Sequence, residues 1–263
     1  MSRFDERWLA LREPCDHAAR SAALAARFAA AQGPDPYIVD LGAGSGSNLR
    51  YLGPLLPPGQ RWLLVDHDPA LLAAAVARLG AAGEVACRTL NLARELPAVP
   101  GRTGITAAAL LDLTSAAWLD AFARWCGKTP VLMALTVDGR LAWRPEEPED
   151  GAVRERFFAH QRNDKGFGPA LGSDAAPYLA ERLEAEGQQV FLEFSDWRLG
   201  PVTAPLLAAT LEGIVAVQAA GIERWALARR RQLAAGRLQL TVGHVDLLAL
   251  PTPIASLPRG LRA

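Results

Sequence analysis

Three glycines at alternate positions form the stretch of this sequence that is best suited to binding a ligand. Gly42, Gly44 and Gly46 follow Asp40, which itself follows a short apolar run typical of a buried strand. Glycine has no Cβ, so such a loop can adopt positive φ angles and let a ligand lie against its backbone amides. The pattern is G-x-G-x-G, and Ser47 stands where a dinucleotide-binding G-x-G-x-x-G would have its last glycine. The loop therefore predicts a small polar ligand and disfavours a nicotinamide dinucleotide.

A carboxylate further along the chain supports this interpretation. Asp66 ends a second apolar run, residues 61–65, about 20 residues beyond the glycine loop. In doubly wound sheets an acid at the tip of the second strand accepts hydrogen bonds from ribose hydroxyls, and this geometry needs that spacing from the loop. The loop and Asp66 together predict a ligand that contains a nucleoside.

Asp40, the glycine loop and Asp66 together resemble the first two motifs of the class I S-adenosylmethionine-dependent methyltransferases. The resemblance implies S-adenosylmethionine as the cofactor and direct in-line transfer of its methyl group to a small-molecule acceptor. It assigns cofactor binding to Asp40, Gly42, Ala43, Gly44, Gly46, Asn48, Asp66, His67, Asn91, Leu92 and Asp112. The family often has an acid at the position of Asn91, where it holds the adenine amino group, so a simple turn role for Asn91 stays open.

Three polar residues are candidates for a general base, which a hydroxyl acceptor would need to take up its proton. They are Asp138, His160 and Asp112. Each has an ordinary alternative role: Asp138 as a turn residue before a glycine, His160 at a helix C-terminus, and Asp112 as the cap of the next helix.

Two other functions stay open. A nicotinamide-dependent reductase of the Rossmann type is suggested by Asp66, although Ser47 and the lack of a Tyr-x-x-x-Lys pair argue against it. A methyltransferase-like protein that binds the cofactor without catalysis is suggested because no acid/base pair stands out.

Composition limits the partners of this chain. Its 263 residues carry a formal net charge of +0, so no long-range field draws it to nucleic acid or to an anionic membrane. Cys15, Cys87 and Cys126 are odd in number and lack a C-x-x-C pair, which predicts neither disulfides nor a metal site. No apolar run approaches the roughly 18 residues of a membrane helix, and we expect a cytoplasmic protein.

Alternating strands and helices predict a single doubly wound, Rossmann-like α/β domain over residues 1–263. The predicted strands cover residues 37–39, 61–65, 84–90, 105–111, 131–137, 189–195 and 239–249. The family resemblance implies a seven-stranded, mostly parallel sheet with an antiparallel last strand. We divide the domain into a cofactor-binding half (35–137), a substrate lid (138–174) and a C-terminal half (175–263).

Two insertions interrupt this alternation. Residues 139–172 hold one short predicted helix, 153–160, within a long loop, which is typical of a lid that recognises the acceptor. A single predicted helix over residues 203–235 separates the last two strands and either roofs the substrate pocket or forms the face of a homodimer. The run Arg229–Arg231 within it predicts a solvated helix face.

The N-terminal segment, residues 7–31, predicts a helix interrupted near Pro14. The family resemblance implies that this helix packs across the mouth of the cofactor site. Arg12, Asp16 and Arg20 recur at every fourth position and so share one helix face. They form either a surface salt-bridge ladder or a wall of the active site.

Overall fold

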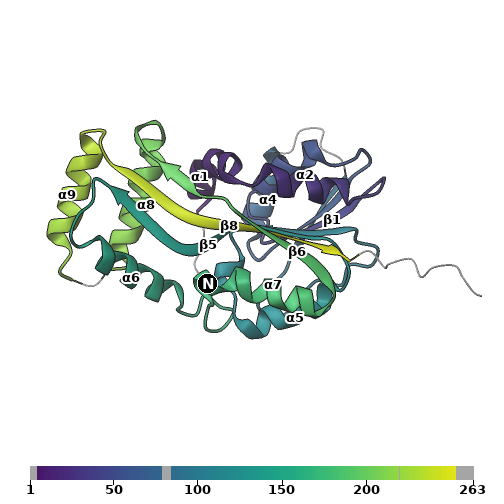
Figure 1. The fold of residues 1–263 in the computed structure, drawn as a ribbon. Helices are drawn as coiled ribbons and strands as arrows, with labels where there is room; N and C mark the ends of the chain where they lie inside the picture. The colour runs from purple at the N-terminus through teal and green to yellow at the C-terminus, as the bar shows by residue number, and fades with distance from the viewer. Residues whose placement is uncertain (1–4, 79–83, 219, 253–263) are drawn as a thin grey trace, which may run out of the picture.

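A computed structural model describes residues 5–78, 84–218 and 220–252. Its centre is a sheet in the order β3-β2-β1-β4-β5-β8-β6, with the short β7 paired to β8. Figure 1 shows β1, β5, β8 and β6 of this sheet between the helices. The strands are β1 (Tyr37–Leu41), β2 (Arg61–Asp66), β3 (Glu84–Thr89), β4 (Gly104–Ala108), β5 (Val131–Arg144), β6 (Gln188–Phe194), β7 (Trp197–Leu199) and β8 (Gln239–Pro251). Strands β1 to β5 pair in parallel, whereas β8 runs antiparallel to β5 and β6. The mostly parallel sheet with an antiparallel last strand is confirmed, and β7 is an addition too short for its alternation to be seen in sequence.

Helices cover both faces of the sheet. They are α1 (Glu6–Ala19), α2 (Ala22–Ala30), α3 (Ser47–Leu52), α4 (Pro69–Arg78), α5 (Ala116–Cys126), α6 (Asp150–Gln161), α7 (Ala175–Ala185), α8 (Ala204–Ala216) and α9 (Glu223–Ala234). One face buries apolar side chains of α2, α3 and α4 together with Trp62 of β2. The other face packs against α5 and α7 (Figure 1). In the described part of the chain, none of these helices has the length and apolarity to cross a membrane.

The N-terminal helix is broken at a place that differs from the prediction. Helix α1 continues through Pro14 and ends at Ala19, and α2 begins after Ser21. The Ser21 side chain accepts the Leu24 amide at 3.0 Å, which makes it the N-cap of α2. The break near Pro14 was therefore the wrong expectation, because the capping serine sets the boundary.

The expected single helix over residues 203–235 is two helices, α8 and α9. They pack with α6 around the far ends of β5 and β8, where Figure 1 shows them gathered at one end of the molecule. This cluster has its own apolar core, which includes Leu141, Trp143, Trp197, Leu207, Leu211 and Trp225. Arg229 is fully buried within it, so the solvated face predicted for the arginine run is wrong at this residue. Its guanidinium pairs with Asp150 and lies 5.4 Å from the Trp225 ring centroid.

The predicted lid is more ordered than expected. Strand β5 does not stop at Val137 but continues to Arg144, which pairs with Gln239 of β8. Asp138 therefore lies inside a strand and not in a turn after it. The helix expected over residues 153–160 is longer, and the irregular parts of the predicted lid are residues 145–149 and the loop 162–171, which leads towards α7.

Candidate functional site

A cavity opens at the carboxyl ends of the parallel strands, where ligands of doubly wound sheets bind. Its walls are α1, the glycine loop, the segments that follow β2, β3 and β4, Leu135 within β5, and the loop after α6. The lining residues are Leu9, Arg12, Asp16, His17, Arg20, Gly42, Ala43, Gly44, Ser45, Ser47, Asn48, Asp66, His67, Leu71, Leu90, Leu92, Ala108, Ala109, Leu110, Leu113, Leu135, Lys165 and Phe167. No described residue of α8 or α9 lines the cavity, so the insertion between the last strands does not roof it.

The glycine loop forms a tight turn against this cavity. Gly42, Gly44 and Gly46 have φ angles of 65°, 51° and 82°, which favour glycine over every other residue. A Cβ added to Gly42 would lie 3.3 Å from the Leu110 side chain. The Ala43 amide donates to the carbonyl of Val65 at 3.0 Å, which fixes the loop to the end of β2. The Gly44 and Gly46 amides also donate within the protein, to Asp66 and to the Ala43 carbonyl, so the loop has a fixed shape beside the cavity.

Asp66 lies at the tip of β2 and is 6% exposed. Its Oδ2 accepts the Gly44 amide at 2.8 Å, and its Oδ1 accepts the Asp68 amide at 3.0 Å. His67 Nδ1 is 3.1 Å from the same Oδ1. A carboxylate oxygen has more than one acceptor position, so Asp66 can still receive hydroxyl donors from the cavity.

Asp40 and Asn48 form a buried pair behind the loop. Asp40 is 0% exposed and does not line the cavity, whereas Asn48 does. Asn48 Nδ2 donates to Asp40 Oδ1 at 2.8 Å, and Asn48 Oδ1 accepts from Arg20 Nη1 at 2.6 Å. Burial raises the pKa of Asp40 to about 7, against the opposing effects of Asn48 and the Arg20 charge. Asp40 therefore orients Asn48 and does not face the ligand itself.

Arg20 lines the cavity and has buried hydrogen-bond donors that the described residues leave unpaired. Its side chain is 6% exposed, and Nε and Nη2 have no hydrogen-bond partner among the described residues. Unpaired donors on a buried guanidinium are costly unless a ligand satisfies them. In the sequence, Arg20 was singled out because it shares a helix face with Arg12 and Asp16. All three residues line the cavity, in agreement with the prediction that this face forms a wall of the site.

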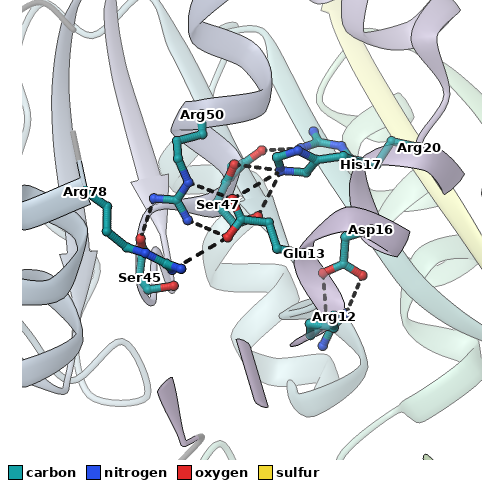
Figure 2. Close-up of polar contacts among 10 residues, drawn as sticks. Arg12, Glu13, Asp16, His17, Arg20, Ser45, Ser47, Arg50 and Arg78 are labelled. Carbon is teal, nitrogen blue, oxygen red and sulfur yellow. Dashed lines mark hydrogen bonds and ion pairs between the residues drawn. The ribbon is translucent and has the colours of Figure 1, made fainter. Parts of the chain in front are cut away.

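Helix α1 is fastened to the start of α3 by a cluster of polar contacts. Figure 2 shows Glu13 and His17 facing Ser47 and Arg50. His17 Nε2 lies 3.0 Å from Ser47 Oγ, and both Arg50–Glu13 contacts are 2.6 Å. Burial acts to raise the pKa of Glu13, but the hydrogen bond and charge of Arg50 outweigh it and lower this pKa. The serine that breaks the dinucleotide pattern is thus an anchor for the helix over the cavity.

Asp16, which lies between Glu13 and His17 in α1, anchors the same part of this helix to another segment. Arg12 Nε donates to Asp16 Oδ2 at 2.7 Å, and Trp197 Nε1 donates to Asp16 Oδ1 at 2.9 Å. Burial raises the pKa of Asp16, while the Arg12 charge and the hydrogen bonds from Arg12 and Trp197 oppose this shift. The C-terminal half of the chain therefore helps to hold the wall that α1 contributes.

The predicted cofactor residues divide into two groups. Gly42, Ala43, Gly44, Asn48, Asp66, His67 and Leu92 line the cavity, whereas Asp40, Gly46, Asn91 and Asp112 do not. Asn91 Oδ1 accepts the Ala93 amide at 3.0 Å, so this side chain takes part in a local turn, and its contact with adenine stays a prediction.

The three candidate bases all lie outside the cavity lining. Asp138 accepts from Arg140 Nε at 2.8 Å in an ion-pair cluster with Asp196 on the surface. His160 is near the end of α6, where burial and the Lys165 charge lower its pKa. Neither side chain reaches the cavity, and their catalytic roles stay predictions without geometric support.

Asp112 lies closer to the site than the other two candidates. It precedes the lining residue Leu113, it is 8% exposed, and its Oδ1 has no partner among the described residues. Burial raises the pKa of Asp112 to about 6. It does not cap the next helix, because Ser115 accepts the Trp118 amide at 3.3 Å and takes that role.

The solved structures that share this architecture include proteins named as methyltransferases. A Bacillus halodurans C-125 protein provisionally named a methyltransferase has a TM-score of 0.53 at 13% identity, covering 88% of this chain and 98% of its own. YcgJ from Bacillus subtilis has a TM-score of 0.52 at 14% identity, with coverages of 88% and 98%. Geranyl diphosphate methyltransferase in complex with S-adenosylmethionine has a TM-score of 0.50 at 14% identity, with coverages of 95% and 93%. The chain has the class I methyltransferase fold; no protein-family model and no curated protein sequence matches it.

Proposed function

We propose that this protein binds S-adenosylmethionine and transfers its methyl group to a small-molecule acceptor. The observation that carries the proposal is the joint geometry of the glycine loop and Asp66, which meet through one hydrogen bond in the wall of the cavity. When bound, the cofactor supplies an electrophilic methyl group on its sulfonium. The chain has to bind, orient and enclose the two reactants.

The residues present suit each part of this cofactor. Asp66 offers acceptors for the ribose hydroxyls, and Leu71, Leu90 and Leu92 provide an apolar surface for the adenine. The free donors of Arg20 suit the carboxylate of the methionine part, and the glycine loop lines the same cavity. The cavity therefore has groups complementary to both the amino-acid end and the nucleoside end of S-adenosylmethionine.

Acceptor recognition is assigned to the loop after α6 and to the face of α1. Lys165 and Phe167 of this loop and Leu9 and Arg12 of α1 line the cavity. Of the three candidate bases, Asp112 is the one next to a residue of the cavity lining, Leu113. Many methyl transfers need only the proximity and alignment of the reactants, so the proposal does not depend on a base.

Isothermal titration calorimetry with S-adenosylmethionine and S-adenosylhomocysteine tests the proposal directly. We expect saturable binding of both, and formation of S-adenosylhomocysteine with a suitable acceptor. No heat of binding at millimolar cofactor would exclude the proposal. Titration with NADH, followed by its fluorescence, separates the reductase alternative, which the His17–Ser47 contact over the start of α3 disfavours. Binding without turnover across a broad acceptor panel would support the non-catalytic alternative.

A further inference from the structure

A single buried carboxylate in β8 connects three segments around the cavity. Asp246 is 1% exposed and does not line the cavity itself. Its Oδ2 accepts the Ser21 amide at 2.9 Å, and its Oδ1 accepts the Leu135 amide at 2.8 Å and the Ser195 hydroxyl at 2.6 Å. A buried carboxylate is costly unless its oxygens are satisfied, and here donors from distant parts of the chain satisfy them.

The first of these bonds holds the backbone beside Arg20. Ser21 follows Arg20 directly, at the break between α1 and α2, and its amide donates to Asp246 and not to a helical carbonyl. Asp246 is also the carboxylate whose charge acts most strongly on the Arg20 guanidinium. One residue therefore holds the backbone beside Arg20 and compensates its buried charge.

The second bond holds a strained residue of β5. Leu135 has a φ angle of 58°, in the left-handed region that residues with a Cβ rarely adopt. It lies at an irregularity in the pairing of β5 with β8, and it lines the cavity. The Asp246 carboxylate thus joins two segments that line the cavity, the end of α1 and the β5 segment at Leu135.

We propose that Asp246 is a positioning residue for the cofactor site: it keeps the Arg20 guanidinium in place to bind the carboxylate of S-adenosylmethionine. This inference rests on the proposed function. It predicts that the effect of changing Asp246 depends on whether the ligand has that carboxylate. A residue with a merely structural role would weaken all ligands alike.

The test compares S-adenosylhomocysteine with its decarboxylated analogue by calorimetry. We expect the wild-type protein to prefer the carboxylate-bearing ligand by about 10- to 100-fold. In Asp246→Asn the amide nitrogen cannot accept from the Ser21 amide, and the charge facing Arg20 is lost. We expect the preference to fall to within about threefold, while the affinity for the analogue changes less than about threefold.

Ser195→Ala is the matched control, because it removes one donor to Asp246 but leaves the charge and both amide bonds. It should keep the wild-type preference. A folded Asp246→Asn protein that keeps the preference, or that weakens both ligands equally, overturns the inference. Failure of the wild-type protein to bind either ligand would instead overturn the proposed function.

Amide hydrogen exchange of the wild-type protein gives an answer even if Asp246→Asn does not fold. We expect S-adenosylhomocysteine to slow exchange in the peptides containing Ser21 and Leu135 more than the decarboxylated analogue does at equal saturation. Equal protection by the two ligands would contradict the proposed coupling.

Discussion

The carboxylate of Asp66 accepts a hydrogen bond from the backbone amide of Gly44 at 2.8 Å. This contact joins the tip of β2 to the loop that follows β1, so the two sequence motifs form one structural unit. The same carboxylate also accepts the Asp68 amide at 3.0 Å. The shape of the loop and the acceptors for a ribose therefore depend on a single side chain.

Asp66→Asn should weaken S-adenosylhomocysteine binding by about 10- to 100-fold, because an amide nitrogen cannot accept from Gly44 or from a ribose hydroxyl. Calorimetry measures the change. Asp174→Asn is the control, since that carboxylate is 56% exposed, pairs with Arg162 and lies outside the cavity lining. Equal affinities of Asp66→Asn and the wild type would rule out the role given to Asp66.

Gly44→Ala should abolish cofactor binding, whereas Gly101→Ala should leave it intact. Both glycines have positive φ angles, 51° and 74°, so alanine costs roughly 1–2 kcal/mol of backbone strain at either position. Only at Gly44 would the new Cβ also meet the cavity wall, 3.2 Å from Leu9 Cδ1, while Gly101 has no atom within 4 Å. Thermal unfolding and calorimetry on both variants separate strain from binding. Loss of binding in both would indicate general destabilisation.

The sequence predicts the parts of this site that depend on local pattern. The glycine loop and Asp66 are recognisable because turn geometry and strand ends constrain residue types over a few positions. The burial of Arg229 could not be predicted, since Trp143 and Asp150, from other segments, decide which face of α9 is covered. For Arg20 the sequence offers only a face shared with Arg12 and Asp16, and the unpaired donors that suit a ligand are visible in the fold alone.

Glu13→Gln should speed cofactor dissociation several-fold, because the Glu13–Arg50 ion pair fastens α1 over the cavity. The control is Glu212→Gln, which removes a similar two-contact pair with Arg230, at 2.8 and 2.6 Å, in the distant helical cluster. Stopped-flow dissociation of a fluorescent cofactor analogue measures both. We expect Glu212→Gln to leave the rate unchanged and to alter stability by at most about 1 kcal/mol, as for other exposed pairs. Equal rates in all three proteins would show that α1 does not control release.

His244→Gln should reduce the loss of stability in acid. His244 is 5% exposed and packs against Trp197, and burial, helped by the Arg12 charge, lowers its pKa to about 3. The unfolded chain binds a proton on this histidine near pH 6.5, so the stabilisation that neutral His244 gives the folded state is present above that pH and is lost as the pH falls towards 3.

Asp40, with its raised pKa of about 7, has the opposite effect on the stability curve, since its stabilisation is lost as the pH rises from 4 to 7. That contribution is present in both proteins and cancels in their difference. Urea unfolding between pH 4 and 6.5 should give a free-energy difference that changes by up to about 1.4 kcal/mol per pH unit; parallel curves would contradict a neutral buried His244.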